Sequence, residues 1–178
     1  MDCRFLKQFM LVISVAALTI TPSYSITHEI LYSICSQTQN EETCIQVLES
    51  DPRTRSSTLP QLSLISINLT RKQAQENHLV FTSLRNNATS PSLKVAYERC
   101  RTLYKQMLSN INVAYQLAKQ GKYKDIDQLG KAQDFAYKCE NGVPPESKTA
   151  GYTMKMLITC QSSASVNAFI ASQPPARS

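Results

Sequence analysis

One stretch of the chain constrains the fold more than any other, because its apolar spacing repeats on both sides of a glycine-containing turn. Before the turn at Lys119-Gln120-Gly121-Lys122, apolar residues recur at intervals that alternate between four and three, which keeps them on one face of an α-helix. These residues are Leu93, Tyr97, Cys100, Tyr104, Met107, Ile111, Ala114 and Ala118. A similar pattern follows the turn, at Ile126, Leu129, Ala132, Ala136 and Cys139. The sequence therefore predicts two antiparallel helices that form a hairpin.

Two cysteines lie at matching heights on this predicted hairpin. Cys100 lies 21 residues before Gly121, and Cys139 lies 18 residues after it. At about 1.5 Å rise per residue, both sulfurs lie roughly 27–31 Å from the turn. Antiparallel helices pack about 8–10 Å apart, so inward-facing cysteines can reach the Cα separation of about 4.4–6.8 Å that a disulfide requires. We therefore expect a Cys100–Cys139 bridge.

The N-terminus is typical of a secretory signal peptide. Arg4 and Lys7 precede an apolar run that extends to Ile20, and Ser23 and Ser25 supply small residues for cleavage before Ile26. The apolar core is too short to span a bilayer comfortably, which disfavours a membrane anchor. We expect residues 1–25 to be removed and the protein to be secreted.

Five cysteines remain after this cleavage, which in a secreted chain indicates disulfides and one unpaired residue. Several pairings are open to five cysteines, but local spacing favours Cys35–Cys44, and the hairpin favours Cys100–Cys139. Loop-closure entropy gives these bridges about 2.7 and about 3.9 kcal/mol of stabilisation, respectively. We expect Cys160 to be a buried free thiol on the last helix.

The remaining pattern predicts an all-α protein. Residues 26–58 contain two short helical segments around Cys35 and Cys44, which predicts an N-terminal helical hairpin. Residues 59–173 contain four helical segments of about 20–28 residues, which predicts an up-down-up-down bundle. The first begins near Pro60, and its apolar pattern weakens at Arg71-Lys72-Gln73. The last begins near Ser147, and together the two parts make one domain, residues 26–178.

Little in the sequence indicates catalysis. The two histidines, His28 and His78, are far apart, and no spacing suits a metal or another cofactor. Asp125 and Asp127 are best interpreted as charges at a helix N-terminus, where the helix dipole favours them. The net charge falls from +6 to +5 when residues 1–25 are removed, and its scattered lysines and arginines favour neither nucleic acid nor a membrane as partner. We expect a protein that is not an enzyme.

Two further sets of residues invite a functional interpretation. Asn68-Leu69-Thr70 and Asn87-Ala88-Thr89 are acceptor sequences for N-glycosylation, and Asn87, in a predicted loop, is the better candidate because Asn68 falls within a predicted helix. Five tyrosines occur near the hairpin at helical spacing, and we expect most of them to lie in or beside the core. They are Tyr97, Tyr104, Tyr115, Tyr123 and Tyr137. Tyr123 is the exception, because it lies at the turn between Lys122 and Lys124, where we expect no core role.

Several of these motifs resemble those of the plant invertase and pectin methylesterase inhibitor family. Cys35 and Cys44, with eight residues between them, followed by Leu48 and Asp51-Pro52, resemble the start of that family's sequences. The second pair of cysteines is similar too: Cys100 is followed by Tyr104, and Cys139 by Glu140-Asn141-Gly142. The resemblance implies an N-terminal helical hairpin before a four-helix bundle, with one disulfide in each. It also implies a secreted, non-catalytic inhibitor, located in the cell wall space or the vacuole, that binds one carbohydrate-active plant enzyme in a 1:1 complex.

The resemblance leaves the target enzyme open. Family members that inhibit invertase carry a Pro-Lys-Phe tripeptide at the bundle hairpin tip, and Gly121-Lys122-Tyr123 occupies the similar position here. A lysine there would pair with the carboxylates of a glycosidase site, so an acid invertase blocked through this tip is our first expectation. The alternative is a pectin methylesterase, covered by a face of the bundle helices. A second alternative is a secreted helical binding protein with no enzyme target.

Overall fold

The computed structural model describes residues 25–147 and 149–174, and these residues form helices and no strand. The all-α prediction is therefore confirmed for this part of the chain. The expected signal peptide lies outside the described residues, apart from Ser25. The α-helices are α2 (His28–Cys35), α3 (Glu41–Glu49), α4 (Leu59–Asn87), α5 (Pro91–Lys119), α6 (Gln128–Glu140) and α7 (Ala150–Ser172). Short 3₁₀ helices lie at Thr54–Ser56, Tyr123–Asp125 and Pro145–Ser147.

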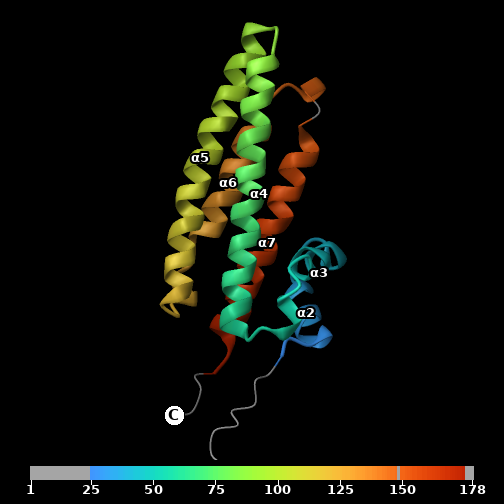
Figure 1. Ribbon diagram of the computed structural model, residues 1–178, viewed down its shortest axis with the longest axis vertical. Helices are drawn as coiled ribbons and strands as arrows, with labels where there is room; N and C mark the ends of the chain where they lie inside the picture. Colours follow the sequence, from blue (N-terminus) through green and yellow to red (C-terminus); the bar gives the residue numbers. More distant parts are fainter. Residues whose placement is uncertain (1–24, 148, 175–178) are drawn as a thin grey trace, which may run out of the picture.

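The first two helices form a small hairpin that docks against the lower half of the bundle beside α7 (Figure 1). Polar residues define where its helices begin: the side chain of Thr27 accepts a hydrogen bond from the Ile30 N–H, and Asn40 Oδ1 accepts one from the Thr43 N–H at 2.9 Å. A disulfide joins Cys35 to Cys44, with 5.7 Å between their Cα atoms. The hairpin contributes to a small core that α4 and α7 complete, and its buried members are Ile26, Leu31, Ile34, Cys35, Cys44, Leu48, Leu62 and Val166.

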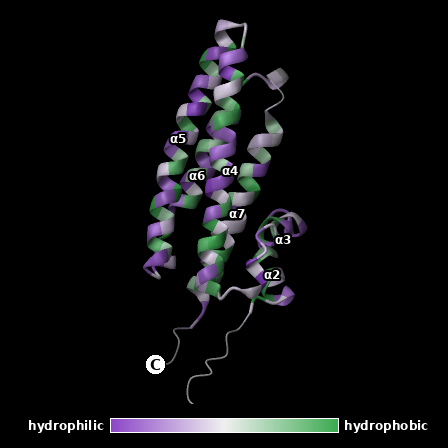
Figure 2. Ribbon diagram, viewed as in Figure 1, coloured by the Kyte–Doolittle hydropathy of each residue, from purple (hydrophilic) through white to green (hydrophobic). Residues whose placement is uncertain are grey.

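The other four helices form the bundle, in which α4 packs beside α5, α5 beside α6, α6 beside α7, and α7 beside α4 (Figure 1). Helix α4 begins with a reciprocal cap: Thr58 N–H donates to Gln61 Oε1, and Gln61 N–H donates to Thr58 Oγ1. Hydrophobic and hydrophilic residues alternate along each long helix, as Figure 2 shows. The main core contains the residues that the α5 periodicity predicts, from Tyr97 to Ala118. Phe81 of α4 stacks on Tyr104 among them, with 5.4 Å between the ring centres.

Helix α6 has only 13 residues, so the expectation of about 20–28 residues is wrong for this helix. The connection that precedes it, residues 120–127, contains only a short 3₁₀ helix, which rises about 2.0 Å per residue instead of about 1.5 Å. From the turn, Cys100 lies about 28 Å along α5, whereas Cys139 lies only about 16 Å along α6. The connection at residues 120–127 therefore spans the remaining distance along the bundle axis. The disulfide between Cys100 and Cys139 forms all the same, with 4.7 Å between their Cα atoms.

A row of buried hydroxyl and amide side chains, here called the polar seam, joins α4 to α7. Ser63 Oγ donates to Asn167 Oδ1 at 2.6 Å, and Thr70 Oγ1 donates to the Thr159 carbonyl at 3.2 Å. Further residues continue the seam: Ser66, Gln73 and Asn77 on α4, and Ser163 on α7. Each buried polar group here has a partner, which avoids the cost of about 1–3 kcal/mol of an unpaired one. The seam explains why the apolar pattern of α4 weakens near Gln73.

Candidate functional site

The tip of the α5–α6 hairpin is closed by backbone hydrogen bonds. Helix α5 ends in a Schellman motif, in which the Gly121 N–H donates to the Ala118 carbonyl and the Lys122 N–H donates to the Leu117 carbonyl, both at 3.0 Å. Gly121 has φ +71°, a left-handed conformation that glycine adopts without strain. Proline cannot adopt this conformation, because its ring fixes φ near −65°. A tripeptide that begins with proline therefore cannot have the backbone conformation that Gly121-Lys122-Tyr123 has here.

The three tip residues do not all face solvent. Gly121 and Lys122 are exposed, and Lys122 forms no ion pair with any described residue. Tyr123 is half-buried, packs against the main core together with Ile126, and lies in the 3₁₀ helix that contacts α7. Burial raises the pKa of its phenol above the ordinary value. The expectation that Tyr123 has no core role is wrong, because the 3₁₀ turn folds its ring back against the bundle.

The two carboxylates near the tip, Asp125 and Asp127, have different surroundings. Asp127 immediately precedes α6, and its carboxylate accepts from Lys131 Nζ at 2.7 Å. This hydrogen bond holds the pKa of Asp127 below its usual range. Asp125 is exposed on the 3₁₀ helix. Within residues 25–147 and 149–174, no group of histidine, cysteine or acidic side chains could hold a metal ion. The helices in these ranges also include none that is long and apolar enough to cross a membrane.

A second candidate is the surface that α5 and α6 present to solvent, here called the α5–α6 face and defined by Arg99, Gln106, Val113, Tyr137 and Lys138. All five side chains are exposed. Val113 and Tyr137 are about half exposed, at 46% and 45%, so the face presents some apolar and aromatic surface to solvent. Helix α5 lies on the side of the bundle away from the N-terminal hairpin (Figure 1), so the hairpin leaves this face uncovered.

The α5–α6 face carries two basic side chains, Arg99 and Lys138, and the exposed acidic Asp134 lies one turn before Lys138 on α6. Helix α5 carries five basic residues and one acidic residue, Glu98. Glu98 forms ion pairs with Arg101 and with Arg85 of α4 and is therefore directed toward α4. On the α5–α6 face, Arg99 and Lys138 form no ion pair with any described residue, so both charges are available to a partner.

The other residues singled out from the sequence lie apart from both surfaces. Cys160 is a free thiol, fully buried within the bundle, and burial raises its pKa to about 12, so it is not reactive at neutral pH. Asn87 is exposed at the last residue of α4. Asn68 is half-buried on the same helix. The expected site residues are thus spread over the molecule and do not form a single site.

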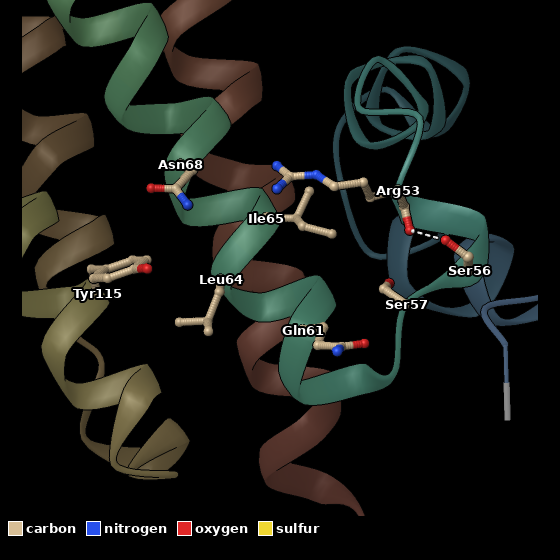
Figure 3. Close-up of a pocket in the computed structure, with 8 residues that line it drawn as sticks. All are labelled: Arg53, Ser56, Ser57, Gln61, Leu64, Ile65, Asn68 and Tyr115. Atoms are coloured by element: carbon tan, nitrogen blue, oxygen red, sulfur yellow. Dashed lines mark hydrogen bonds between the residues drawn. The ribbon is translucent and has the colours of Figure 1, made fainter. Parts of the chain in front are cut away.

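The structure also contains a cleft that sequence reasoning missed. It has a volume of about 410 Å³ and lies across α4, between α5 and the segment that follows α3 (Figure 3). Its lining residues are Arg53, Ser56, Ser57, Gln61, Leu64, Ile65, Asn68 and Tyr115. They come from three separate parts of the chain, so no local motif could have revealed them.

The bundle and its two disulfides agree with what comparison with known families shows. The family model described as "Plant invertase/pectin methylesterase inhibitor" matches residues 29–168. The chain therefore belongs to this family, and it is an inhibitor-type protein and not an enzyme.

Two curated relatives give a more particular likeness. The chain is 31% identical to "Pectinesterase inhibitor" from Actinidia deliciosa over 148 residues, which cover 82% of this chain and 80% of that protein. It is 29% identical to "Pectinesterase inhibitor 2" from Arabidopsis thaliana over 109 residues, which cover 61% of this chain and 63% of that protein.

Solved structures support the fold. A mutant form of a pectin methylesterase inhibitor from Arabidopsis superposes with a TM-score of 0.68 at 19% identity, over 78% of this chain and 95% of that one. A further pectin methylesterase inhibitor from Arabidopsis thaliana gives 0.60 at 18% identity, over 82% of this chain and 98% of that one. At this level of identity the likeness establishes the helical fold alone.

Proposed function

We propose that this protein is a secreted inhibitor of a plant pectin methylesterase. The observation that carries the proposal is the match to the Actinidia pectinesterase inhibitor over about four fifths of both chains. Secretion is supported by the two disulfides, because such bridges persist in oxidising compartments outside the cytosol. The expected signal peptide directs the protein to the same destination, the cell wall space.

An acid invertase, the target that the tip motif favoured, has less support than a pectin methylesterase. Gly121 lies in a conformation closed to proline, and Tyr123 is turned toward the core. Lys122 is then the one residue of the three with a long side chain free in solvent. Gly121 has no side chain and Tyr123 packs against the core, so the tip offers an enzyme's active site one side chain instead of a tripeptide.

The α5–α6 face is better suited to cover an enzyme's substrate cleft. Tyr137 offers an aromatic anchor, a residue type that tends to dominate binding energy at protein interfaces, and Val113 adds apolar surface. Arg99 and Lys138, next in sequence to the bridged Cys100 and Cys139, offer positive charges without ion pairs at the Tyr137 end of the face, and such charges accelerate association with an acidic partner surface. The Cys100–Cys139 bridge fixes α5 against α6, so little conformational entropy is lost when the face docks.

This mode of inhibition requires no chemistry from the inhibitor. The bundle blocks access of the polysaccharide to the enzyme by occupying the cleft, and one inhibitor molecule is sufficient for one enzyme. Inhibition is therefore reversible, and it weakens as ionic strength rises, because salt screens the contribution of Arg99 and Lys138.

The test is a titration of a purified plant pectin methylesterase with the mature protein, followed by two charge-reversed variants. Arg99→Glu with Lys138→Glu reverses both charges of the α5–α6 face. Lys72→Glu with Lys155→Glu reverses two exposed charges on α4 and α7 and serves as the matched control. We expect the first variant to raise the inhibition constant at least about tenfold, and the control to change it by less than about twofold. Equal effects of the two variants would contradict the proposal that the α5–α6 face binds the enzyme. A wild-type protein that does not inhibit the enzyme would contradict the proposed function.

A further inference from the structure

Asn68 begins an acceptor sequence for N-glycosylation. It lies within helix α4, but its side chain is more accessible than a position inside a bundle helix suggests. Its side chain lines the cleft across α4 and is half-buried there, instead of being packed between helices. Figure 3 shows the amide directed to the side of α4 on which Tyr115 lies. A group attached to the Asn68 amide therefore has a cleft beside it, whereas Asn87 lies exposed at the end of α4.

The lining of the cleft suits a sugar. Leu64 and Tyr115 supply apolar and aromatic surface on one side, while Arg53 and Ser56 supply polar groups on the other (Figure 3). The Arg53 guanidinium also donates to Asp51, and Ser56 Oγ donates to the Arg53 carbonyl. Binding sites for small molecules typically combine such apolar surface with a few polar groups. The volume of about 410 Å³ falls within the usual range of ligand sites, about 300–1,000 Å³.

Tyr115 is held in place before any ligand arrives. The guanidinium carbon of Arg71, one turn beyond Asn68 on α4, lies 4.6 Å from the centre of the Tyr115 ring. This cation–π contact fixes an aromatic surface at the edge of the cleft. A sugar that rests against a fixed ring loses less free energy to ordering than one that must first immobilise a mobile side chain.

The burial of Thr70, the third residue of the acceptor sequence, indicates that the sugar is attached before the protein folds. In the folded protein Thr70 Oγ1 donates to the carbonyls of Ser66 and Thr159 in the polar seam, so this hydroxyl is not accessible. The acceptor sequence must then be modified before α4 packs against α7. After folding, Asn68 still faces the cleft, so an attached sugar remains compatible with the packed bundle.

We propose that Asn68 carries an N-linked glycan whose first sugars lie in this cleft against Tyr115. In the transfer, Asn68 Nδ2 forms a bond to C1 of the sugar of a lipid-linked oligosaccharide, the bond between C1 and the diphosphate oxygen breaks, and Nδ2 loses one proton. The lipid diphosphate is the leaving group. The inference rests on the proposed secretion and not on the enzyme target. Because the cleft lies on the α4 side of α5, the glycan leaves the α5–α6 face free.

The experiment uses the full chain expressed in cultured plant cells and recovered from the medium. Mass spectrometry of glycopeptides measures occupancy at Asn68 and Asn87, and a peptide-N-glycosidase then measures the rate of sugar release from the native protein. We expect Asn68 to be occupied. Release from it should be about tenfold slower than in a Tyr115→Ala variant, a factor that corresponds to about 1.4 kcal/mol. Tyr115→Phe, which retains the ring, should behave like the wild type.

Two controls keep the result interpretable. Tyr137→Ala removes a tyrosine from α6, outside the cleft, and should leave the release rate unchanged. Arg53→Ala changes an exposed side chain at the opposite edge of the cleft, so it tests the docking even if Tyr115→Ala does not fold. We expect Arg53→Ala to accelerate release about threefold.

Two results would overturn the inference. The first is an unmodified Asn68, which includes failure of the chain to reach the medium, and the second is a release rate that neither Tyr115→Ala nor Arg53→Ala alters. Inhibition assays on the same preparations separate this inference from the proposed function. A chain that inhibits pectin methylesterase without sugar on Asn68 contradicts only the glycan, and a glycosylated chain that inhibits no enzyme contradicts only the function.

Discussion

The molecule contains two helical hairpins that are each closed by one disulfide, yet the two are stabilised differently. The N-terminal hairpin joins helices of 8 and 9 residues through a bridge that spans 9 positions. The α5–α6 hairpin joins helices of 29 and 13 residues through a bridge that spans 39. The first hairpin needs Leu62 and Val166 of the bundle to cover its apolar side, whereas α5 and α6 belong to the main core. A disulfide alone therefore does not make a hairpin an independent structural unit.

The two hairpins also differ in charge. Residues 26–58 carry five acidic and two basic side chains, whereas the α5–α6 hairpin, residues 91–140, carries five acidic and nine basic side chains, and its excess positive charge lies on α5. The acidic hairpin lies beside α7, and the basic helix lies on the far side of the bundle. This separation is consistent with a division of roles in which the first hairpin caps the core and the second binds the enzyme.

The largest effect we expect is the loss of the long-range bridge. Cys100→Ala with Cys139→Ala should lower the free energy of unfolding by about 3.9 kcal/mol, because the bridge closes a long loop in the unfolded chain. Urea denaturation of the mature protein measures this change. A loss smaller than that caused by removing the N-terminal bridge would contradict the view that α5 and α6 form the better-fixed hairpin.

Loss of the short-range bridge should have a smaller and more local effect. Cys35→Ala with Cys44→Ala should destabilise the N-terminal hairpin by about 2.7 kcal/mol. If this hairpin opens separately from the bundle, its amide hydrogens should exchange about a hundredfold faster while those of α5 change little. Hydrogen exchange followed by mass spectrometry resolves the two regions. Equal acceleration in α2 and α5 would indicate that the hairpin and the bundle unfold together.

A helix cap provides a weaker test of the same difference. Asn40→Ala removes the acceptor of the Thr43 N–H at the start of α3 and should lower the free energy of unfolding by about 1 kcal/mol. Asp127 has the corresponding position before α6, but its side chain makes no capping hydrogen bond. Asp127→Ala should therefore have a smaller effect in the same thermal or urea experiment. A larger effect for Asp127 would contradict this assignment of the caps.

The smallest effect we expect depends on pH. The hydrogen bond from the Arg53 side chain lowers the pKa of Asp51, at the exit of the N-terminal hairpin, from 3.8 to about 2. The stabilisation is therefore complete above about pH 4 and is lost as the pH falls through about 2. Asp51→Asn should remove this part of the acid sensitivity, measured as the melting temperature between pH 2 and pH 5. Asp127→Asn should change it less, because the Asp127 carboxylate is 63% exposed and that of Asp51 only 13%.

Apolar spacing and helix breakers predicted much of the fold. Pro60, the Ser90-Pro91 pair and the alternating apolar residues of α5 placed two long helices that the structure contains. The positions of the cysteines led to the same two bridges that the structure shows. These features depend on local chemistry and on helix geometry, which a single sequence contains.

Other features depend on tertiary packing and could not be predicted in this way. The polar seam pairs Ser63 with Asn167, 104 positions apart, and apolar periodicity does not register hydroxyl and amide side chains. Tyr123 looked exposed because Lys122 and Lys124 flank it, but the 3₁₀ turn directs its ring to the core. The cleft beside Asn68 and the α5–α6 face exist only once separate segments are assembled.

The identity of the target enzyme is tested most directly by titrating the purified mature protein against two plant enzymes in parallel, a pectin methylesterase and an acid invertase. We predict saturable inhibition of the pectin methylesterase, with an end point of one inhibitor per enzyme, and no change in invertase activity. Inhibition of the invertase alone would contradict the account and restore Lys122 at the hairpin tip as the inhibitory residue.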